Sequence, residues 1–115
     1  MDGRVSPKKV DRNHGACRDA LRAAGWYVYD SHRVGGGFVD LIASKHGRVV
    51  FVEVKDGSLP PSRRQLTPDE QVVHAAFALS GAEVYVMEDA ADLSYFERPR
   101  SDPRSYDERG RLRGA

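Results

Sequence analysis

Apolar residues near the start of the chain recur with the period of a helix. A spacing of three or four positions places these residues on one helix face: Cys17, Ala20, Leu21 and Ala24. Asp11 and Asn13 are residue types that cap helix N-termini, and Gly25 is typical of the position that follows a helix C-terminus. The pattern predicts a first helix between these residues.

Later segments change to the β-branched and aromatic composition of strands. The sequence predicts four strands, at about residues 26–30, 38–43, 49–55 and 82–87. The first two are separated by Gly35, Gly36 and Gly37, which predict a sharp bend because consecutive glycines do not hold regular structure cheaply.

A second helix is predicted to begin at the segment TPDE, residues 67–70. Thr67 is a good capping residue, Pro68 suits the first helical position, and Glu70 completes a capping box. The helix should end just before Gly81. The apolar residues that we expect it to bury are Val72, Val73, Ala76, Phe77 and Leu79.

The element order is therefore α-β-β-β-α-β, which indicates an α/β fold. The first three strands can form an antiparallel meander, and the fourth can join in parallel through a right-handed crossover. We expect a mixed four-stranded sheet flanked by helices, within a domain of residues 13–96. A flexible basic segment, 1–12, would precede this domain, and a disordered Arg-rich tail, 97–115, would follow it.

Composition narrows the class of protein. The chain has 115 residues, of which 40% are hydrophobic and 30% charged, and this balance suits one globular domain. No apolar run approaches the ~20 residues of a membrane span, and the single Cys17 fits a reducing compartment, so we expect a cytoplasmic protein with no membrane partner. The net charge is +1, and the basic ends suit a polyanionic partner as well as simple solubility.

The segment GFVDLIASKHGRVVFVEVKDG, residues 37–57, places charges within the most strand-like part of the chain. If His46 and Gly47 form a two-residue hairpin turn, Asp40 faces Glu53 across the two strands. Directly opposed residues have Cβ atoms about 5 Å apart. Lys55 should share a strand face with Glu53, because side chains alternate along a strand.

Two opposed carboxylates on a half-buried sheet repel each other unless a cation lies between them. Mg²⁺ takes oxygen ligands and commonly uses one or two carboxylates together with substrate phosphate. Lys55 could then reach a phosphate oxygen or a metal-bound water. The alternative is that Asp40, Glu53 and Lys55 form a salt-bridged cluster on an exposed sheet face.

Three features of the sequence occur together: Gly37-x-x-Asp40, the later Glu53-Val54-Lys55, and a helix that opens with TPDEQ. This combination resembles the PD-(D/E)XK nuclease superfamily, and within it the small stand-alone VRR-NUC nucleases of bacteria and phages. The resemblance covers about residues 13–87 and implies an αβββαβ restriction-endonuclease-like core.

The resemblance implies a role for each matching residue. Asp40 and Glu53 would bind Mg²⁺ or Mn²⁺, with the backbone carbonyl of Val54 as a further ligand. Lys55 would orient or activate the attacking water. Gln71 would touch the site or a phosphate; the alternative is that it is a solvated helix residue.

The sequence departs from the family pattern at two positions. Val39 stands where the namesake signature has Pro, and Asn13 stands about where many relatives carry a Glu in the first helix. The glycines precede a strand and do not form G-x-G-x-x-G, so no nucleotide cofactor is expected. The residues that we expect to contact the nucleic-acid backbone are Arg33, Gly36, Gly37, Lys45, Arg63 and Arg64.

The expected function is that of a metal-dependent DNA endonuclease. A chain this small has no separate sequence-reading domain, so recognition of branched DNA, such as a Holliday junction, is favoured, with a homodimer supplying two cuts. One alternative is a non-catalytic DNA-binding or accessory protein on the same fold. The other is a nuclease that acts on flaps, single strands or RNA.

Overall fold

The computed structural model describes residues 11–97, which contain two α-helices, four strands and three short 3₁₀ segments. The predicted Arg-rich tail, apart from Glu97, and residues 1–10 of the predicted basic segment lie outside the described residues. In chain order the elements are α1 (His14–Ala23), β1 (Tyr27–Asp30), η1 (His32–Val34), β2 (Leu41–Lys45), β3 (Arg48–Val54), η2 (Pro61–Arg63), α2 (Pro68–Leu79), β4 (Glu83–Met87) and η3 (Ala90–Tyr95).

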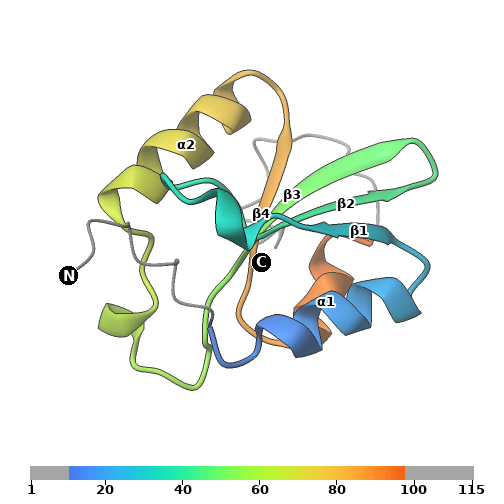
Figure 1. Ribbon diagram of the computed structural model, residues 1–115, viewed down its shortest axis with the longest axis horizontal. Coiled ribbons are helices and arrows are strands. Elements are labelled where there is room, and N and C mark those ends of the chain that lie inside the picture. The colour runs from blue at the N-terminus through green and yellow to red at the C-terminus, as the bar shows by residue number, and fades with distance from the viewer. Residues whose placement is uncertain (1–10, 98–115) are drawn as a thin grey trace, which may run out of the picture.

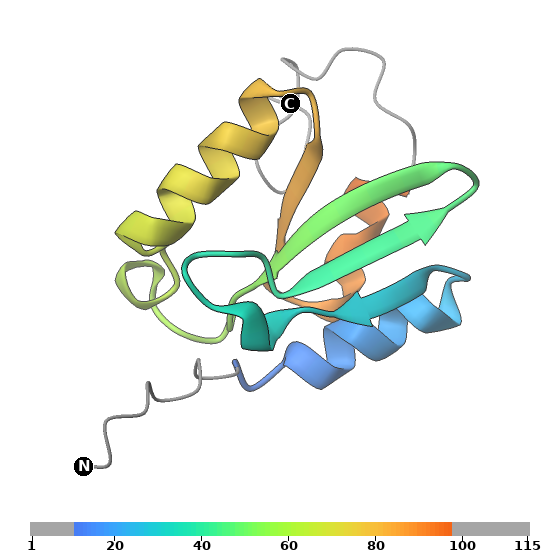
Figure 2. The same cartoon turned by 45° about the horizontal axis from the view of Figure 1, so that its top comes forward.

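The strands form one mixed sheet in the order β1-β2-β3-β4. β1, β2 and β3 pair antiparallel, and β4 joins β3 in parallel after the α2 crossover. Helices α1 and α2 lie on opposite sides of this sheet, and η3 lies beside α1 (Figures 1 and 2). The predicted α/β fold, with a mixed four-stranded sheet flanked by helices, is confirmed.

The β2–β3 hairpin has the predicted turn. His46 and Gly47 both have positive φ, 51° and 79°, as a two-residue turn that matches the strand twist requires. Lys45 pairs with Arg48, and the same register continues to the pair Leu41–Val52. No helix in the described part of the chain, residues 11–97, is long and apolar enough to cross a membrane.

The main hydrophobic core lies between the sheet and α1. The predicted apolar face of α1 is buried there. The sequence pattern did not predict η3, and the completely buried Phe96 directly after it closes the core. Burial raises the pKa of the Cys17 thiol to about 12, so this cysteine is inert. The core residues are Cys17, Leu21, Trp26, Val28, Leu41, Ala43, Val50, Val52, Val54, Tyr85, Met87 and Phe96.

The predicted burial of the apolar residues of helix α2 is wrong for most of them. Val72 is 70% exposed, Leu79 is 89% exposed and Ala76 is also exposed, whereas Val73 and Phe77 are half-buried. Apolar residues occupy most positions of this helix, so hydrophobicity alone does not define its buried face. The residues that α2 does bury are polar, Glu70 and His74.

Aromatic packing holds α2 against the sheet. The ring of Phe77 stacks on Phe51 with a centroid distance of 4.6 Å, and Phe38 meets Phe77 edge-on at 5.9 Å. These contacts fix the helix beside β3 and leave Glu70 and His74 over the carboxyl end of that strand.

Gly37 brings the glycine bend into contact with α2. It has a φ of +86°, and a Cβ atom on Gly37 would lie 2.5 Å from the backbone carbonyl of Asp69. Gly36 also has a positive φ, +64°, but faces open space. The close neighbour of Gly37 is therefore the first turn of α2.

We expect Gly37→Ala to destabilise the protein more than Gly36→Ala. Both substitutions place a side chain at positive φ, which costs about 1–2 kcal/mol. Only Gly37→Ala adds a clash with the Asp69 backbone, at a further ~1–3 kcal/mol. Urea unfolding of the two variants measures this difference, and equal losses of stability would show that the bend does not press against α2.

Candidate active site

The predicted charged residues gather on the side of the sheet that faces α2. Asp40 is 4% exposed, Glu53 is completely buried and Lys55 is 9% exposed. Val52 and Val54 point into the opposite, α1-side core, so alternation places Glu53 toward α2. The exposed-face alternative for this cluster is therefore excluded.

Three of the hydrogen bonds that Asp40 makes hold it in place. Its N–H donates to the Val52 carbonyl at 3.1 Å, its carbonyl accepts from the Ser31 N–H at 2.8 Å, and its carboxylate accepts from the Val54 N–H at 2.8 Å. The predicted direct pairing of Asp40 with Glu53 is wrong in detail, because the regular ladder ends at Leu41. This irregularity aims the carboxylate at the backbone between Glu53 and Lys55.

Lys55 forms a short ion pair with α2. Its Nζ lies 2.7 Å from Glu70 Oε1 and 4.0 Å from Glu53 Oε2. The same Oε1 of Glu70 accepts the N–H of Thr67 at 2.9 Å, and the Glu70 N–H donates to the Thr67 hydroxyl. The capping box predicted from the sequence therefore also positions the partner of Lys55.

Glu53 lies between Lys55, which directly follows β3, and His74 of α2. His74 Nε2 lies 3.3 Å from Glu53 Oε1. Burial opposes ionisation of Glu70, but hydrogen bonds from Lys55, the Thr67 N–H and Glu53 outweigh it and lower the pKa of Glu70 to about 2. Glu70 is thus the ionised partner of Lys55, with Glu53 between this pair and His74.

Asp11 adds a fourth carboxyl group near the cluster. Burial raises the pKa of Asp11, and the charges of Asp40, Asp56 and Glu70 add to this effect, whereas Lys55 opposes it. The carboxyl groups around Lys55 outnumber its single positive charge, which favours the approach of cations.

The residues at the site fit a hard divalent cation. Mg²⁺ and Mn²⁺ prefer carboxylate and carbonyl oxygens, and Asp40 and Glu53 supply two such groups beside the Val54 peptide. His74 contributes a nitrogen, but it faces Glu53 and serves as its hydrogen-bond partner.

Two other predicted or weighed residues take different positions. Gln71 is exposed and donates to the Leu66 carbonyl at 3.1 Å, so its side chain lies outside the cluster and the preceding residue, Glu70, faces inward. The Asn13 amide nitrogen donates to the carbonyls of Lys55, at 2.9 Å, and Glu88, at 2.8 Å. Asn13 therefore ties α1 to the ends of β3 and β4.

The residues predicted to contact phosphate divide into two groups. Arg33 and Arg63 are exposed, and no residue in the described range 11–97 forms an ion pair with either. Arg64 instead pairs with Glu88 at 2.6 Å. Lys45 lies at the far end of β2 from Asp40, where it donates to the Ala24 carbonyl at 2.6 Å.

The two glycines predicted to contact the nucleic-acid backbone differ in their surroundings. Gly36 faces open space, so a phosphate backbone can approach it, whereas the position beside Gly37 is filled by Asp69. The structure therefore leaves Arg33, Arg63 and Gly36 open on the surface.

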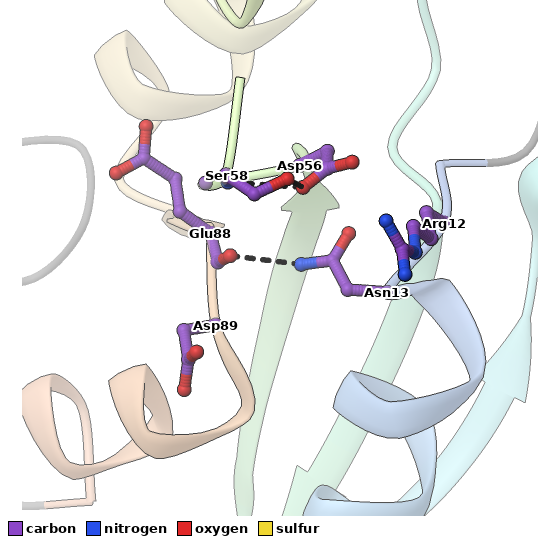
Figure 3. Close-up of a pocket in the computed structure, with 7 residues that line it drawn as sticks. Arg12, Asn13, Asp56, Ser58, Glu88 and Asp89 are labelled. Atoms are coloured by element: carbon purple, nitrogen blue, oxygen red, sulfur yellow. Dashed lines mark hydrogen bonds between the residues drawn. The ribbon is translucent and has the colours of Figure 1, made fainter. Parts of the chain in front are cut away.

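A polar cavity of about 650 Å³ opens at the carboxyl ends of β3 and β4 (Figure 3). In this view the Asn13 side chain lies between Arg12 and Glu88, and its amide nitrogen donates to the Glu88 carbonyl. The side chains of Asp40, Glu53 and Lys55 are not part of the lining, which consists of Arg12, Asn13, Asp56, Gly57, Ser58, Glu88 and Asp89.

Sequence reasoning did not assign Glu70 to the site. Glu70 was recognised only as a capping residue, yet its spacing of four from His74 places both on one helix face. That spacing could have indicated that Glu70 and His74 face the same neighbour. Nothing comparable marked Asp11, which precedes the first helix.

We expect Glu70→Gln to reduce stability in a pH-dependent way. Glutamine can keep the cap to Thr67 but loses the charge that pairs with Lys55, at a cost of ~1–3 kcal/mol. Because the pKa of Glu70 is lowered from 4.5 to about 2, its contribution is complete above pH 4.5 and is lost as the pH falls toward 2. The gap between wild type and variant in urea unfolding should shrink below pH 4.5.

The control for this experiment is Asp69→Asn, which changes an exposed carboxylate in the same helical turn. Its effect on stability should be smaller than that of Glu70→Gln at pH 7. A Glu70→Gln effect that stays constant from pH 7 to pH 3 would contradict the ion pair.

Comparison of the chain with models of known protein families finds no match, and no curated protein matches it. The likeness to PD-(D/E)XK nucleases therefore rests on the motif residues alone.

Proposed function

We propose that this protein is a metal-dependent nuclease that hydrolyses phosphodiester bonds in DNA. The observation that carries the proposal is the hydrogen bond from the Val54 N–H to Asp40, which holds one buried carboxylate beside Glu53 and Lys55. Asp40, Glu53 and Lys55 all lie at the end of β3, and two carboxylates with an ammonium are groups that would hold a cation and a phosphate there.

The free-energy cost of burying charged groups supports a functional role for the cluster. Each buried ion loses hydration worth several kcal/mol, and replacing buried ion pairs by apolar residues is often neutral or stabilising. The opposite face of the same sheet is a continuous apolar core. Buried charges on the α2 face therefore lower the stability that this face could have with apolar residues. Holding a cation would explain why they are there.

The residues of the chain would divide the chemistry. Asp40 and Glu53 would hold Mg²⁺ or Mn²⁺, which when bound polarises the scissile phosphate and lowers the pKa of a coordinated water. Glu70 keeps the ammonium of Lys55 in place at 2.7 Å. Lys55 is then a hydrogen-bond donor that can orient the water or a phosphate oxygen.

Substrate contact would come from the open surface beside the site. Arg33 and Arg63 are exposed cations on η1 and η2, the two 3₁₀ segments in the connections that precede β2 and α2. Such side chains bind phosphates without reading bases. This supports recognition of backbone shape, and we propose branched DNA, including four-way junctions, as the substrate.

Two copies would be needed to cut both strands of a junction. The outward side of α2 carries Val72 and Leu79, both strongly exposed. Ala75 and Ala76 are exposed between them on the same helix face, and a contiguous exposed apolar patch of this kind is typical of an interaction site. We therefore propose that the homodimer forms through α2.

A second candidate is a DNA-binding protein in which the cluster is purely structural. The observation that favours it is internal neutralisation: Lys55 pairs with Glu70, and His74 contacts Glu53. In that case the cluster would hold α2 on the sheet and take no part in chemistry.

Asp40→Asn and Lys55→Met are expected to lower the rate of Mg²⁺- or Mn²⁺-dependent cleavage by ~100-fold or more. Binding of the same DNA should change only a few-fold, because Arg33 and Arg63 remain. The measurement uses labelled four-way junction, flap and linear duplex DNA, with single-stranded RNA alongside.

The matched control is Asp69→Asn, an exposed acid outside the cluster, which should cleave at the wild-type rate. Equal cleavage by wild type, Asp40→Asn and Lys55→Met would exclude catalysis at this site. Binding of all substrates without cleavage in either metal would select the structural alternative.

Leu79→Lys is expected to weaken the dimer about tenfold or more, because it places a charge on the outward apolar surface of α2. Sedimentation velocity across a range of concentrations gives the dissociation constant. An unchanged constant, or a wild type that is monomeric throughout, would rule out pairing through α2.

A further inference from the structure

A second cluster of ligating side chains lies on the other face of the sheet. His14 Nε2 is 2.9 Å from Asp30 Oδ2, and His32 Nδ1 is 2.6 Å from Asp30 Oδ1. The two imidazole nitrogens and a carboxylate oxygen all lie within 4.8 Å of one another. Asp30 pairs with the core residue Leu41, which places it on the α1 side, away from Glu53.

We propose that His14, Asp30 and His32 form a binding site for a divalent transition-metal ion such as Zn²⁺. Two imidazoles and one carboxylate form an N₂O donor set, which suits Zn²⁺, Co²⁺ or Ni²⁺ better than Mg²⁺. Tetrahedral coordination at 2.0–2.1 Å needs donor atoms about 3.3 Å apart, so small ring movements convert the hydrogen-bonded cluster into a coordinated one.

Backbone and ring contacts hold these ligands near one another. His14 is 4% exposed in the first turn of α1, and Asp30 is the last residue of β1. The His32 backbone N–H donates to Asp30 Oδ1 at 3.3 Å, and the two imidazole rings meet edge-on with centroids 5.1 Å apart. The ligands come from three separate elements, α1, β1 and η1, so an ion would crosslink them.

One cation already competes for this position. Arg18 Nη1 lies 3.5 Å from Asp30 Oδ2, but the Arg18 side chain is 31% exposed and also pairs with Asp19. It can withdraw toward Asp19 when an ion binds. The ion would bind the two ring nitrogens that now face Asp30, and a proton on either would pass to the other ring nitrogen or to solvent; solvent would supply the fourth ligand.

The site would support the segment that carries Asp40. Ser31 lies between Asp30 and His32, donates its N–H to the Asp40 carbonyl at 2.8 Å and donates its hydroxyl to the Val39 carbonyl at 2.8 Å. An ion held on both sides of Ser31 therefore stiffens the backbone that positions Asp40. The role of the ion is structural, and its binding does not depend on nuclease activity.

The test is a titration of metal-stripped, full-length protein with Zn²⁺ by calorimetry and with Co²⁺ by visible absorption. We expect one equivalent bound per chain, with affinity lowered ~10-fold or more by His32→Ala and by Asp30→Asn. Arg18→Gln should raise the affinity, because the competing guanidinium is gone. Excess Mg²⁺ should not displace the ion.

Two control variants separate this site from the others. His46→Ala changes an exposed turn histidine, and Asp69→Asn changes an exposed carboxylate of α2; both should bind Zn²⁺ like wild type. Circular dichroism checks that each variant is folded. The proposal fails if folded wild type shows no saturable Zn²⁺ or Co²⁺ binding, or if folded His32→Ala and Asp30→Asn keep the wild-type affinity.

Discussion

Buried charge between β3 and α2 is the constraint on which the rest of the structure depends. Glu53 is completely buried, and Lys55 is nearly so, and each must recover from protein groups the interactions it lost with water. Glu70 supplies them to Lys55 at 2.7 Å, and His74 approaches Glu53 at 3.3 Å. The polar side chains of α2 therefore decide which face of the helix meets the sheet, with Phe77 as the main apolar anchor.

Local signals were enough to predict most of the fold. His46-Gly47 adopts the positive φ values of a two-residue turn, and the turn alone fixes the register from Lys45 to Leu41. The capping box at Thr67 set the start of α2, and both of its hydrogen bonds form. These features depend on residues that are near one another in the sequence, so they can be predicted from one amino-acid sequence.

The predictions that were wrong concern residues whose position depends on groups far away in the sequence. Val72 and Leu79 were expected to be buried because they are apolar, but the pairing of Glu70 with Lys55 turns them outward. The bond from the Val54 N–H to the Asp40 side chain replaces regular pairing at the end of the ladder. Neither effect can be found from hydrophobic periodicity, because each depends on which polar group satisfies another after folding.

Backbone hydrogen bonds hold the two candidate acids, because Asp40 lies directly before β2 and Glu53 lies near the end of β3. Asp40 is held through hydrogen bonds to Ser31, Val52 and Val54. The proposed catalytic role would need such positioning, since productive geometry tolerates errors of roughly 0.5 Å. Ser31 in turn lies within the histidine-flanked corner on the far face of the sheet. The sheet is thin enough that one residue joins the two polar clusters. An ion bound by the proposed site on the α1 side would therefore stiffen the backbone that carries Asp40 on the α2 side.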